Sequence, residues 1–301
     1  MHIGVAATPD VAIPTLNWLL ESEHEIALVI SQPDRPAGRG RELTPSPVTL
    51  WAQDRGVGLL RPHSPSELIG AIETLDLVLT IGYGTLLPES ILSLPRHGFI
   101  NLHFSLLPAY RGAAPAQRAI ENGESVTGVT VFSLDKGMDT GPIYTATELA
   151  IDKDWRSLEL LKALAELGPQ VVNEALLAIE SGVKPHPQIG LATLAPKITK
   201  QDARLKWSLS SEVLSRKIRA FYPAPCAWTT WEENTFKITR AAISTIDVPV
   251  GEVVVIDGDV IVGCGSRTAL RLDSVVPAGK REMTATEWAR GARLVQGAHF
   301  G

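Results

Sequence analysis

Cysteine is scarce in this sequence. Only Cys226 and Cys264 occur, without Cys-x-x-Cys spacing and without a nearby histidine cluster. This usage excludes a disulfide framework and a zinc motif, and it favours a reducing compartment with no bound metal. The first 20 residues lack a basic region and contain Asp10, so they do not form a secretory signal. We therefore expect a cytoplasmic protein.

Long apolar runs, repeats and low-complexity tracts are also missing. No uninterrupted apolar run reaches the ~18 residues of a membrane helix, so we expect no membrane partner. With 45% hydrophobic and 20% charged residues, the chain has the composition of a globular protein. Its 301 residues fit two domains better than one.

Two common nucleotide-binding motifs are absent. The first expected strand is followed by Gly4-Val-Ala-Ala-Thr-Pro-Asp10 and not by Gly-x-Gly-x-x-Gly. The short motifs Gly38-Arg-Gly40 and Gly263-Cys-Gly265 lack a third glycine and the strand-to-helix setting. The Walker pattern does not occur either. These absences argue against a nicotinamide dinucleotide and against a P-loop.

The charge is unevenly distributed. Residues 1–195 contain 13 lysines and arginines against 22 acidic residues, whereas residues 196–301 contain 15 against 11. The first part therefore carries −9 and the second +4. Because neutralising phosphates dominates nucleic-acid affinity, the basic second part is the better candidate for contact with a polyanion.

Apolar strand patterns alternate with helical ones in the first part of the chain. Continuously apolar strands such as Glu25–Ser31 and Asp76–Ile81 fit a parallel sheet covered on both faces. Thr8 is expected to cap a first helix, Ser46 a second, and a long amphipathic helix is expected over Trp155–Ser181. After a helix over Ser211–Phe221, five short strands and a last helix from Thr284 to Leu294 indicate a small β-barrel. We predict an α/β catalytic domain over 1–189, a linker over 190–206 and a small barrel domain over 207–301.

The chemistry concentrates between Asn101 and Pro142. Asn101 and His103 end an apolar strand two residues apart, so both side chains project from the same side of its carboxyl end, where open α/β sheets bind ligands. Asp139 follows in a tight Gly-Met-Asp-Thr-Gly turn. Taken singly, each residue has an ordinary structural interpretation. Together, an amide, an imidazole and a carboxylate predict one reactive pocket.

The sequence of this stretch resembles that of the formyltransferases that use 10-formyltetrahydrofolate. The match rests on Asn-x-His at 101–103, Ser-Leu-Leu-Pro at 105–108, Arg-Gly-Ala-Ala-Pro at 111–115 and Asp-Thr-Gly at 139–141. The resemblance implies a Rossmann-like formyltransferase domain followed by a barrel of the oligonucleotide-binding type. It also implies that Asn101, His103 and Asp139 are catalytic. The folate pocket is then expected along Gly82–Pro88 and the Ser-Leu-Leu-Pro segment, at Tyr83, Gly84, Leu86, Leu87, Pro88, Ser105, Leu106, Leu107 and Pro108.

A sixteen-residue segment from Gln32 to Pro47 resembles the loop by which tRNA-directed members of this family grip the acceptor end of initiator tRNA. A connection of this length is longer than the usual 2–6 residues. Arginine pairs with phosphates and stacks on bases, which suits RNA contact. The resemblance assigns this role to Arg35, Arg39 and Arg41, and extends it to the linker residues Lys197, Lys200 and Arg204.

Formyl transfer to an amine makes two chemical demands. The oxyanion needs preorganised donors, which Asn101 and a protonated His103 are expected to supply. The amine must also lose a proton, and Asp139 is the candidate base, directly, through His103 or through water. The carboxylate is expected to raise the pKa of the imidazole and fix its tautomer. We expect direct transfer, without a covalent enzyme intermediate.

The resemblance implies formylation of the α-amino group of methionyl initiator tRNA, giving N-formylmethionyl-tRNA for translation initiation. The expected partners are this tRNA and the folate, with no DNA partner and a monomeric state. Two alternatives stay open. One is a formyltransferase acting on an amino sugar nucleotide or another small amine, and the other is an RNA-binding protein that has lost catalysis.

Overall fold

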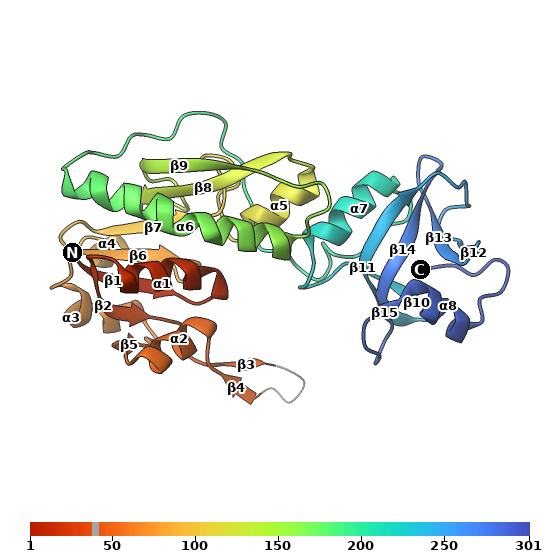
Figure 1. The fold of residues 1–301 in the computed structure, drawn as a ribbon, viewed down its shortest axis with the longest axis horizontal. Coiled ribbons are helices and arrows are strands. Elements are labelled where there is room, and N and C mark those ends of the chain that lie inside the picture. The colour runs from red at the N-terminus through yellow and green to blue at the C-terminus, as the bar shows by residue number, and fades with distance from the viewer. Residues whose placement is uncertain (38–41) are drawn as a thin grey trace. The chain divides into compact units, whose positions relative to one another are not determined.

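A computed structural model describes residues 1–37 and 42–301 (Figure 1). The chain forms two compact units that interleave along the sequence. The first comprises Met1–Pro115, Val126–Ala150 and Leu161–Pro196, and the second comprises Ala116–Ser125, Ile151–Leu160 and Lys197–Gly301. The expected linker 190–206 is therefore divided at Pro196, and two short segments of the expected catalytic domain belong to the second unit.

The first unit is built on a seven-stranded sheet. Its order is β5 (Leu59–Leu60), β2 (Glu25–Ile30), β1 (His2–Ala7), β6 (Leu77–Ile81), β7 (Phe99–His103), β8 (Val126–Ser133) and β9 (Ile143–Ala150). The first five strands run parallel, and β8 and β9 are antiparallel to their neighbours. All five residues of β6 are buried, as expected for a strand covered on both faces. The predicted parallel-rich α/β sheet is confirmed.

Proline and capping residues mark the starts of helices in this unit. The helices are α1 (Ile13–Glu21), α2 (Pro47–Arg55), α3 (Ile69–Ile72), α4 (Glu89–Leu92) and most of α6 (Ser157–Glu180), with 3-10 turns over Asp10–Ala12 and Pro65–Leu68. The predicted cap of α2 is confirmed, because Ser46 Oγ accepts from the backbone N–H of Thr49 at 3.0 Å. The predicted cap at Thr8 is wrong. Pro14 has no N–H and fits only a first turn, so α1 begins at Ile13, and the Thr8 hydroxyl donates instead to the carbonyl of Tyr83.

The long segment from Gln32 to Pro47 contains two strands that the sequence did not reveal. β3 (Arg35–Ala37) pairs antiparallel with β4 (Glu42–Thr44). Arg35 lies on β3, whereas Arg39 and Arg41 lie outside the described residues. The Arg35 side chain donates from Nη2 to Gln32 Oε1 at 3.0 Å.

The second unit is an antiparallel sheet with three helices and the first turn of α6. The strand order is β10 (Trp228–Trp231), β11 (Asn234–Ser244), β14 (Thr268–Val276), β13 (Asp259–Cys264) and β12 (Val253–Ile256), and β15 (Met283–Thr284) pairs with β14. The helices are α5 (Pro115–Asn122), α7 (Ser211–Ala220) and α8 (Ala285–Ala292). The expected last helix is α8, and Thr284 is its N-cap, since the Thr284 hydroxyl accepts from the N–H of Glu287. The predicted separate domain of short antiparallel strands is confirmed.

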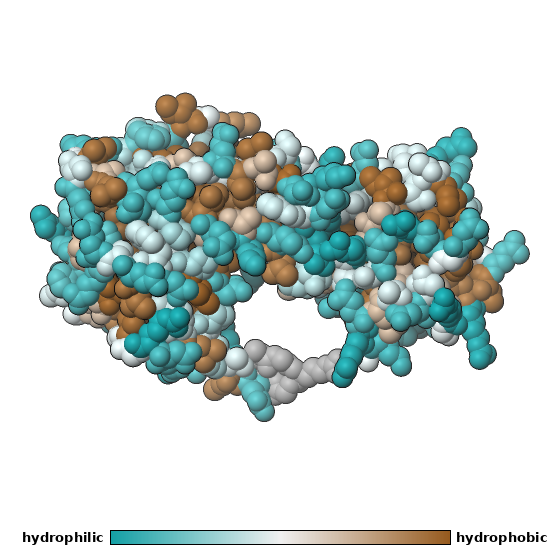
Figure 2. Space-filling model, viewed as in Figure 1, coloured by the Kyte–Doolittle hydropathy of each residue, from teal (hydrophilic) through white to brown (hydrophobic). Residues whose placement is uncertain are grey.

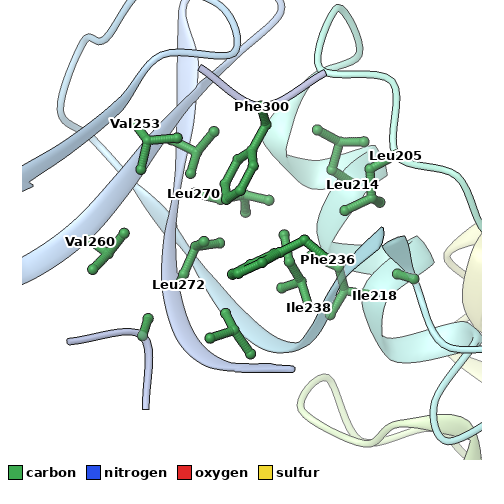
Figure 3. Close-up of a cluster of buried hydrophobic side chains, with 14 of the residues drawn as sticks. Leu205, Leu214, Ile218, Phe236, Ile238, Val253, Val260, Leu270, Leu272 and Phe300 are labelled. Carbon is green, nitrogen blue, oxygen red and sulfur yellow. The ribbon is translucent and has the colours of Figure 1, made fainter. Parts of the chain in front are cut away.

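The chain end completes the core of this unit. Residues 298–301 bond to both outer strands: Val253 N–H donates to Ala298 O at 2.8 Å, and Gly301 N–H donates to Thr230 O at 3.0 Å. Phe300 and Phe236 point into one cluster of buried side chains (Figure 3). The Phe300 ring lies 5.1 Å from that of Phe236 and 5.5 Å from that of Trp207. The strands alone leave the barrel open, and this terminal segment bridges β10 and β12.

On the face drawn in Figure 2, hydrophobic side chains form small separate groups among hydrophilic ones. Within residues 1–37 and 42–301, no helix is both long and apolar enough to span a bilayer. Both cysteines are buried and unbridged, and burial raises the pKa of the Cys264 thiol to about 12.

Candidate active site

A cavity of about 400 Å³ lies in the first unit where β6 and β7 end. Its size falls within the usual range of small-molecule sites. Asn101, His103 and Asp139 all line it, so the structure brings the three predicted residues together. The rest of the wall comes from residues 80–87, from the loop after β7 and from the turn that carries Asp139.

Asn101 is held by its neighbour on β6. The Thr80 hydroxyl donates to Asn101 Oδ1 at 2.8 Å, and it also lies 3.1 Å from the carbonyl oxygen of Ile100. Within the described part of the chain, no protein atom accepts a hydrogen bond from Asn101 Nδ2. The amide N–H₂ group is therefore available to donate to an oxygen in the cavity. Thr80 was not foreseen as a site residue, although register pairs it directly with Asn101.

His103 is buried, with 5% of its surface exposed. Its Nε2 lies 3.0 Å from the carbonyl oxygen of Tyr110, and because a carbonyl can only accept, Nε2 carries the proton. Nδ1 then faces Asp139, with 3.7 Å between Nδ1 and Oδ2. This separation is too long for a direct hydrogen bond.

Burial lowers the pKa of His103 below its usual value of 6.5, and the Asp139 carboxylate and the Tyr110 carbonyl oppose that shift only in part. The Asp139 carboxylate does raise the pKa of the imidazole, as expected, but burial outweighs it and the net shift is downward. The expected protonated donor is wrong, because the lowered pKa leaves the imidazole neutral at neutral pH. Its one N–H points at a backbone carbonyl and not at a developing oxyanion.

Asp139 is fixed by a backbone donor from the loop after β7. Gly112 N–H donates to Asp139 Oδ2 at 2.7 Å. Gly112 has φ of +124°, and a Cβ there would stand 2.7 Å from the carbonyl oxygen of Ala195. Only glycine satisfies both the backbone angle and the close approach. The Arg-Gly-Ala-Ala-Pro motif thus supplies the N–H that holds the carboxylate.

Gln188 is a site residue that sequence reasoning missed. Its Nε2 donates to the carbonyls of Asp139 at 2.9 Å and Gly141 at 2.8 Å. Its Oε1 accepts from Arg111 Nε at 3.2 Å and Nη2 at 2.6 Å. One amide therefore ties the turn of Asp139 to the loop that carries Gly112. The segment 182–194 has no periodicity that would have singled this residue out.

The expected folate pocket is only partly on the cavity wall. Tyr83, Gly84, Leu86 and Leu87 line it, joined by residues that were not foreseen, namely Leu92, Phe104, Leu134 and Met138. Among the described residues, Pro88, Ser105, Leu106, Leu107 and Pro108 are not part of this lining. Ser105 is fully buried and donates to the carbonyl of Ala109 at 2.6 Å, and Leu107 packs on Phe132 and Ile143. The Ser-Leu-Leu-Pro segment therefore supports the loop after β7 through buried contacts and does not line the cavity.

The wall that does form suits a flat, largely apolar ring system. Leucine side chains and the backbone of a glycine-containing loop make up much of it, with Leu86 77% exposed at the rim. Gln32 Nε2 donates to the carbonyl of Tyr83 at 3.3 Å and to the Thr85 hydroxyl, which connects this loop to the segment carrying Arg35.

The linker residues proposed for RNA contact lie in the second unit. Lys200 Nζ stands 5.1 Å and Arg204 Cζ 5.5 Å from the ring centre of Trp228, and Trp228 Nε1 donates to the Lys200 carbonyl at 2.7 Å. Lys197 is exposed. Across residues 1–37 and 42–301, no cluster of three or more metal-ligating side chains is found.

The end of β7 and the turn between β8 and β9 bring an amide, an imidazole and a carboxylate to one cavity, an arrangement that can serve proton transfer and group transfer. Residues 3–176 match the formyl transferase family, and residues 197–293 match the formyl transferase C-terminal domain. The chain belongs to the formyl transferase family, and it is an enzyme of one-carbon formyl transfer.

Three relatives illustrate the likeness. The methionyl-tRNA formyltransferase of Salinispora tropica is 41% identical over 307 residues, covering 99% of each chain. The crystal structure of HypX from Aquifex aeolicus in complex with tetrahydrofolic acid matches 96% of this chain and 47% of that one, with a TM-score of 0.69 and 18% identity. An N-formyltransferase from Helicobacter canadensis, solved with folinic acid and dTDP-3-aminofucose, matches 90% of this chain and 98% of its own, with a TM-score of 0.68 and 15% identity. The two solved structures share the fold.

Proposed function

We propose that this protein transfers the formyl group of 10-formyltetrahydrofolate to the α-amino group of methionyl initiator tRNA. The observation that carries the choice of acceptor is the 41% identity, along essentially the whole of both chains, to a methionyl-tRNA formyltransferase. A cytoplasmic location, where translation starts, is part of the same proposal.

The pair His103 and Asp139 holds the acceptor amine. His103 Nδ1 and Asp139 Oδ2 are two acceptors 3.7 Å apart that both belong to the cavity wall. An amino group has N–H donors for both, and it fits this pair better than a group with only acceptors. As the amine nitrogen forms its bond to the formyl carbon, its proton passes to the pair and then to the leaving folate nitrogen as the carbon–nitrogen bond of the donor breaks.

Asn101 stabilises the oxyanion. Among the described residues its Nδ2 donors have no acceptor, while Thr80 fixes Oδ1 and so sets the direction of the amide. Donors held in advance at the site of developing charge lower the barrier, and loss of one such donor costs ~10²–10³-fold in rate. The formyl donor supplies an activated one-carbon group, and the apolar wall with the loop 82–87 binds its flat ring.

Cations outside the cavity support an RNA acceptor. Lys200 and Arg204 are held against Trp228, and Arg35 stands at the base of the β3–β4 segment. We propose contacts to the tRNA for these residues, for Lys197, and for Arg39 and Arg41, which lie outside the described residues. Arginine and aromatic side chains together suit single-stranded RNA ends.

A second candidate keeps the cavity and changes the acceptor to an amino sugar nucleotide. The observation that favours it is the fold shared with the Helicobacter canadensis N-formyltransferase, whose structure contains dTDP-3-aminofucose. Its identity of 15% carries the fold alone. The antiparallel second unit with its basic linker favours the RNA acceptor.

The decisive experiment measures formyl incorporation from 10-formyltetrahydrofolate into methionyl initiator tRNA and, in parallel, into dTDP-3-aminofucose. We expect turnover on the tRNA only. Asp139→Asn keeps an oxygen for the Gly112 N–H but removes the base, and it should lose about 10²–10⁴-fold in kcat. Turnover on the sugar alone would replace the proposal with the second candidate, and no turnover on either would favour an RNA-binding protein without catalysis.

A further inference from the structure

A second cleft, of about 560 Å³, lies entirely within the second unit. The segment 151–160, α7 and β11 form its walls. Its charged lining is mostly basic, with five cationic and three acidic side chains: Lys153, Arg156, Arg216, Arg219 and Arg240 against Asp154, Glu212 and Asp273.

Two of these charges are already neutralised. Arg156 pairs with Glu159 at 2.6 Å and lies over the Tyr222 ring, and Asp273 pairs with Arg271 at 3.1 Å. The remaining four cations face only two acids. In the part of the chain that the structure describes, no carboxylate lies within 4.0 Å of Lys153, Arg216, Arg219 or Arg240. The described residues of the cleft therefore keep an excess of positive charge that is not engaged in close ion pairs, although the Asp154 and Asp152 carboxylates act on Arg219 at longer range.

The two arginines on α7 are held in place. The Arg216 guanidinium packs against the turn after α5, where a Cβ on Gly123 would stand 2.5 Å from Arg216 Cζ. Arg219 Nη1 donates to the Trp155 carbonyl at 2.9 Å. Burial lowers the pKa of Arg219 and Arg216 adds to that shift, while the Asp154 and Asp152 carboxylates oppose it in part. Like charges one turn apart on a helix destabilise it unless an anion compensates them.

We propose that this cleft binds phosphate groups of an RNA backbone, at a site separate from the catalytic cavity and from the Trp228 cluster. Guanidinium groups pair with phosphate oxygens through two parallel hydrogen bonds. No aromatic side chain is among the described lining residues, so the cleft offers backbone contact without base stacking. The short apolar residues Ala241, Ala242 and Ile243 of β11 also line the cleft. The choice of RNA as ligand rests on the proposed function.

The test measures binding of uncharged initiator tRNA, and of a blunt RNA hairpin without a single-stranded end, as a function of salt concentration. Each phosphate contact adds about 0.9 to the slope of log K against log salt. Replacing two cations, in Arg216→Gln/Arg240→Gln, should therefore reduce the slope by about 1 to 2 for both RNAs and weaken binding by about 10- to 100-fold near 0.1 M salt. The control Arg281→Gln removes one charge from an exposed position outside the cleft and should change affinity less than about 2-fold.

A variant expected to increase RNA affinity separates the loss of a binding site from misfolding. Glu212→Gln removes an acid from the exposed first turn of α7 at the cleft and should tighten RNA binding, a gain that damaged protein does not show. The proposal is overturned if the double variant binds RNA like Arg281→Gln, or if Glu212→Gln leaves binding unchanged. It is also overturned if millimolar inorganic phosphate protects the Arg216 side chain from an arginine-modifying reagent while RNA does not. The cleft is then a site for small anions.

Failure of this proposal differs from failure of the proposed function. If the wild type formylates methionyl-tRNA while the cleft variants bind RNA normally, the function stands and the cleft assignment falls. If the wild type formylates no tRNA but the cleft variants lose RNA binding, the cleft assignment stands and the acceptor is wrong.

Discussion

At the scale of single residues, the reactive groups depend on backbone atoms. The Tyr110 carbonyl fixes the tautomer of His103, and the Gly112 N–H fixes the Asp139 carboxylate. His103 is neutral because burial outweighs a carboxylate that stands 3.7 Å away. A neutral imidazole can accept the proton that the acceptor amine must lose.

The lowered pKa of His103 predicts how stability depends on pH. The folded state binds this proton more weakly than the unfolded state, so the contribution is fully present above pH 6.5 and is lost as the pH falls through the folded pKa. The free energy of unfolding should fall on acidification below pH 6.5, and less steeply in His103→Gln. An NMR titration of the His103 ring should give a pKa below 6.5, and a value above 6.5 would contradict the prediction.

Gln188→Ala should lower kcat by about 10- to 100-fold, because it frees the turn that positions Asp139 from Arg111, and small misplacements of reacting groups cost this much. Steady-state kinetics with saturating tRNA would measure the loss. Gln170→Ala, which removes an exposed amide that donates to Glu174, is the matched control and should keep full activity. Equal kcat in both variants would show that Gln188 does not position the turn.

At the scale of secondary-structure elements, residues 298–301 stabilise the second unit in the way a strand would, by bonding to neighbouring strands and adding a side chain to the core. Phe300 is 6% exposed, and its ring is stacked or tilted against Trp207, Phe236 and Trp288. Residues 298–301 make this insertion possible by bonding to both outer strands. The core of the second unit thus contains a residue from outside every helix and strand.

Phe300→Ala should lower the free energy of unfolding by about 3–5 kcal/mol, the usual cost of removing a buried aromatic ring. Denaturant unfolding followed by tryptophan fluorescence would measure it, because tryptophans surround the ring. Val295→Ala changes a 73% exposed side chain nearby and should have little effect. A loss below about 1 kcal/mol for Phe300→Ala would indicate that the tail detaches readily.

The elements themselves were largely predictable, and the reasons are local. Apolar runs located β2 and β6, a serine before a proline located the start of α2, and alternation along β7 placed Asn101 and His103 together. The β3–β4 pair and the tail at Phe300 were not predicted, because both are too short to show a period. The role of Gln188 depends on the meeting of distant segments, which no local pattern encodes.

At the scale of the whole molecule, segments of the two units alternate along the sequence. α5 and the segment 151–160 belong to the second unit although they precede much of the first. Lys217 pairs with Glu121 on α5 at 2.9 Å, and Ser157 donates to the carbonyl of Tyr222. The second unit is therefore incomplete without residues that precede position 161.

A fragment of residues 197–301 should unfold at a lower denaturant concentration than the second unit of the full chain, since it lacks α5 and the segment 151–160. Circular dichroism against urea would compare the two midpoints. Full-length Glu121→Ala loses only the ion pairs of one carboxylate and should fall between them. Coinciding midpoints for fragment and full chain would show that these segments contribute nothing to stability.

The same interleaving constrains how such proteins diverge. A recombination event that exchanged everything after Pro196 between two relatives would import Arg216 and Lys217 without the Gly123 and Glu121 on which they rest. In the resulting hybrid protein, residues 216 and 217 from one relative would contact residues 121 and 123 from the other. Positions 121 with 217 and 123 with 216 should therefore covary across descendants, and the three stretches of sequence that form the second unit should be inherited together.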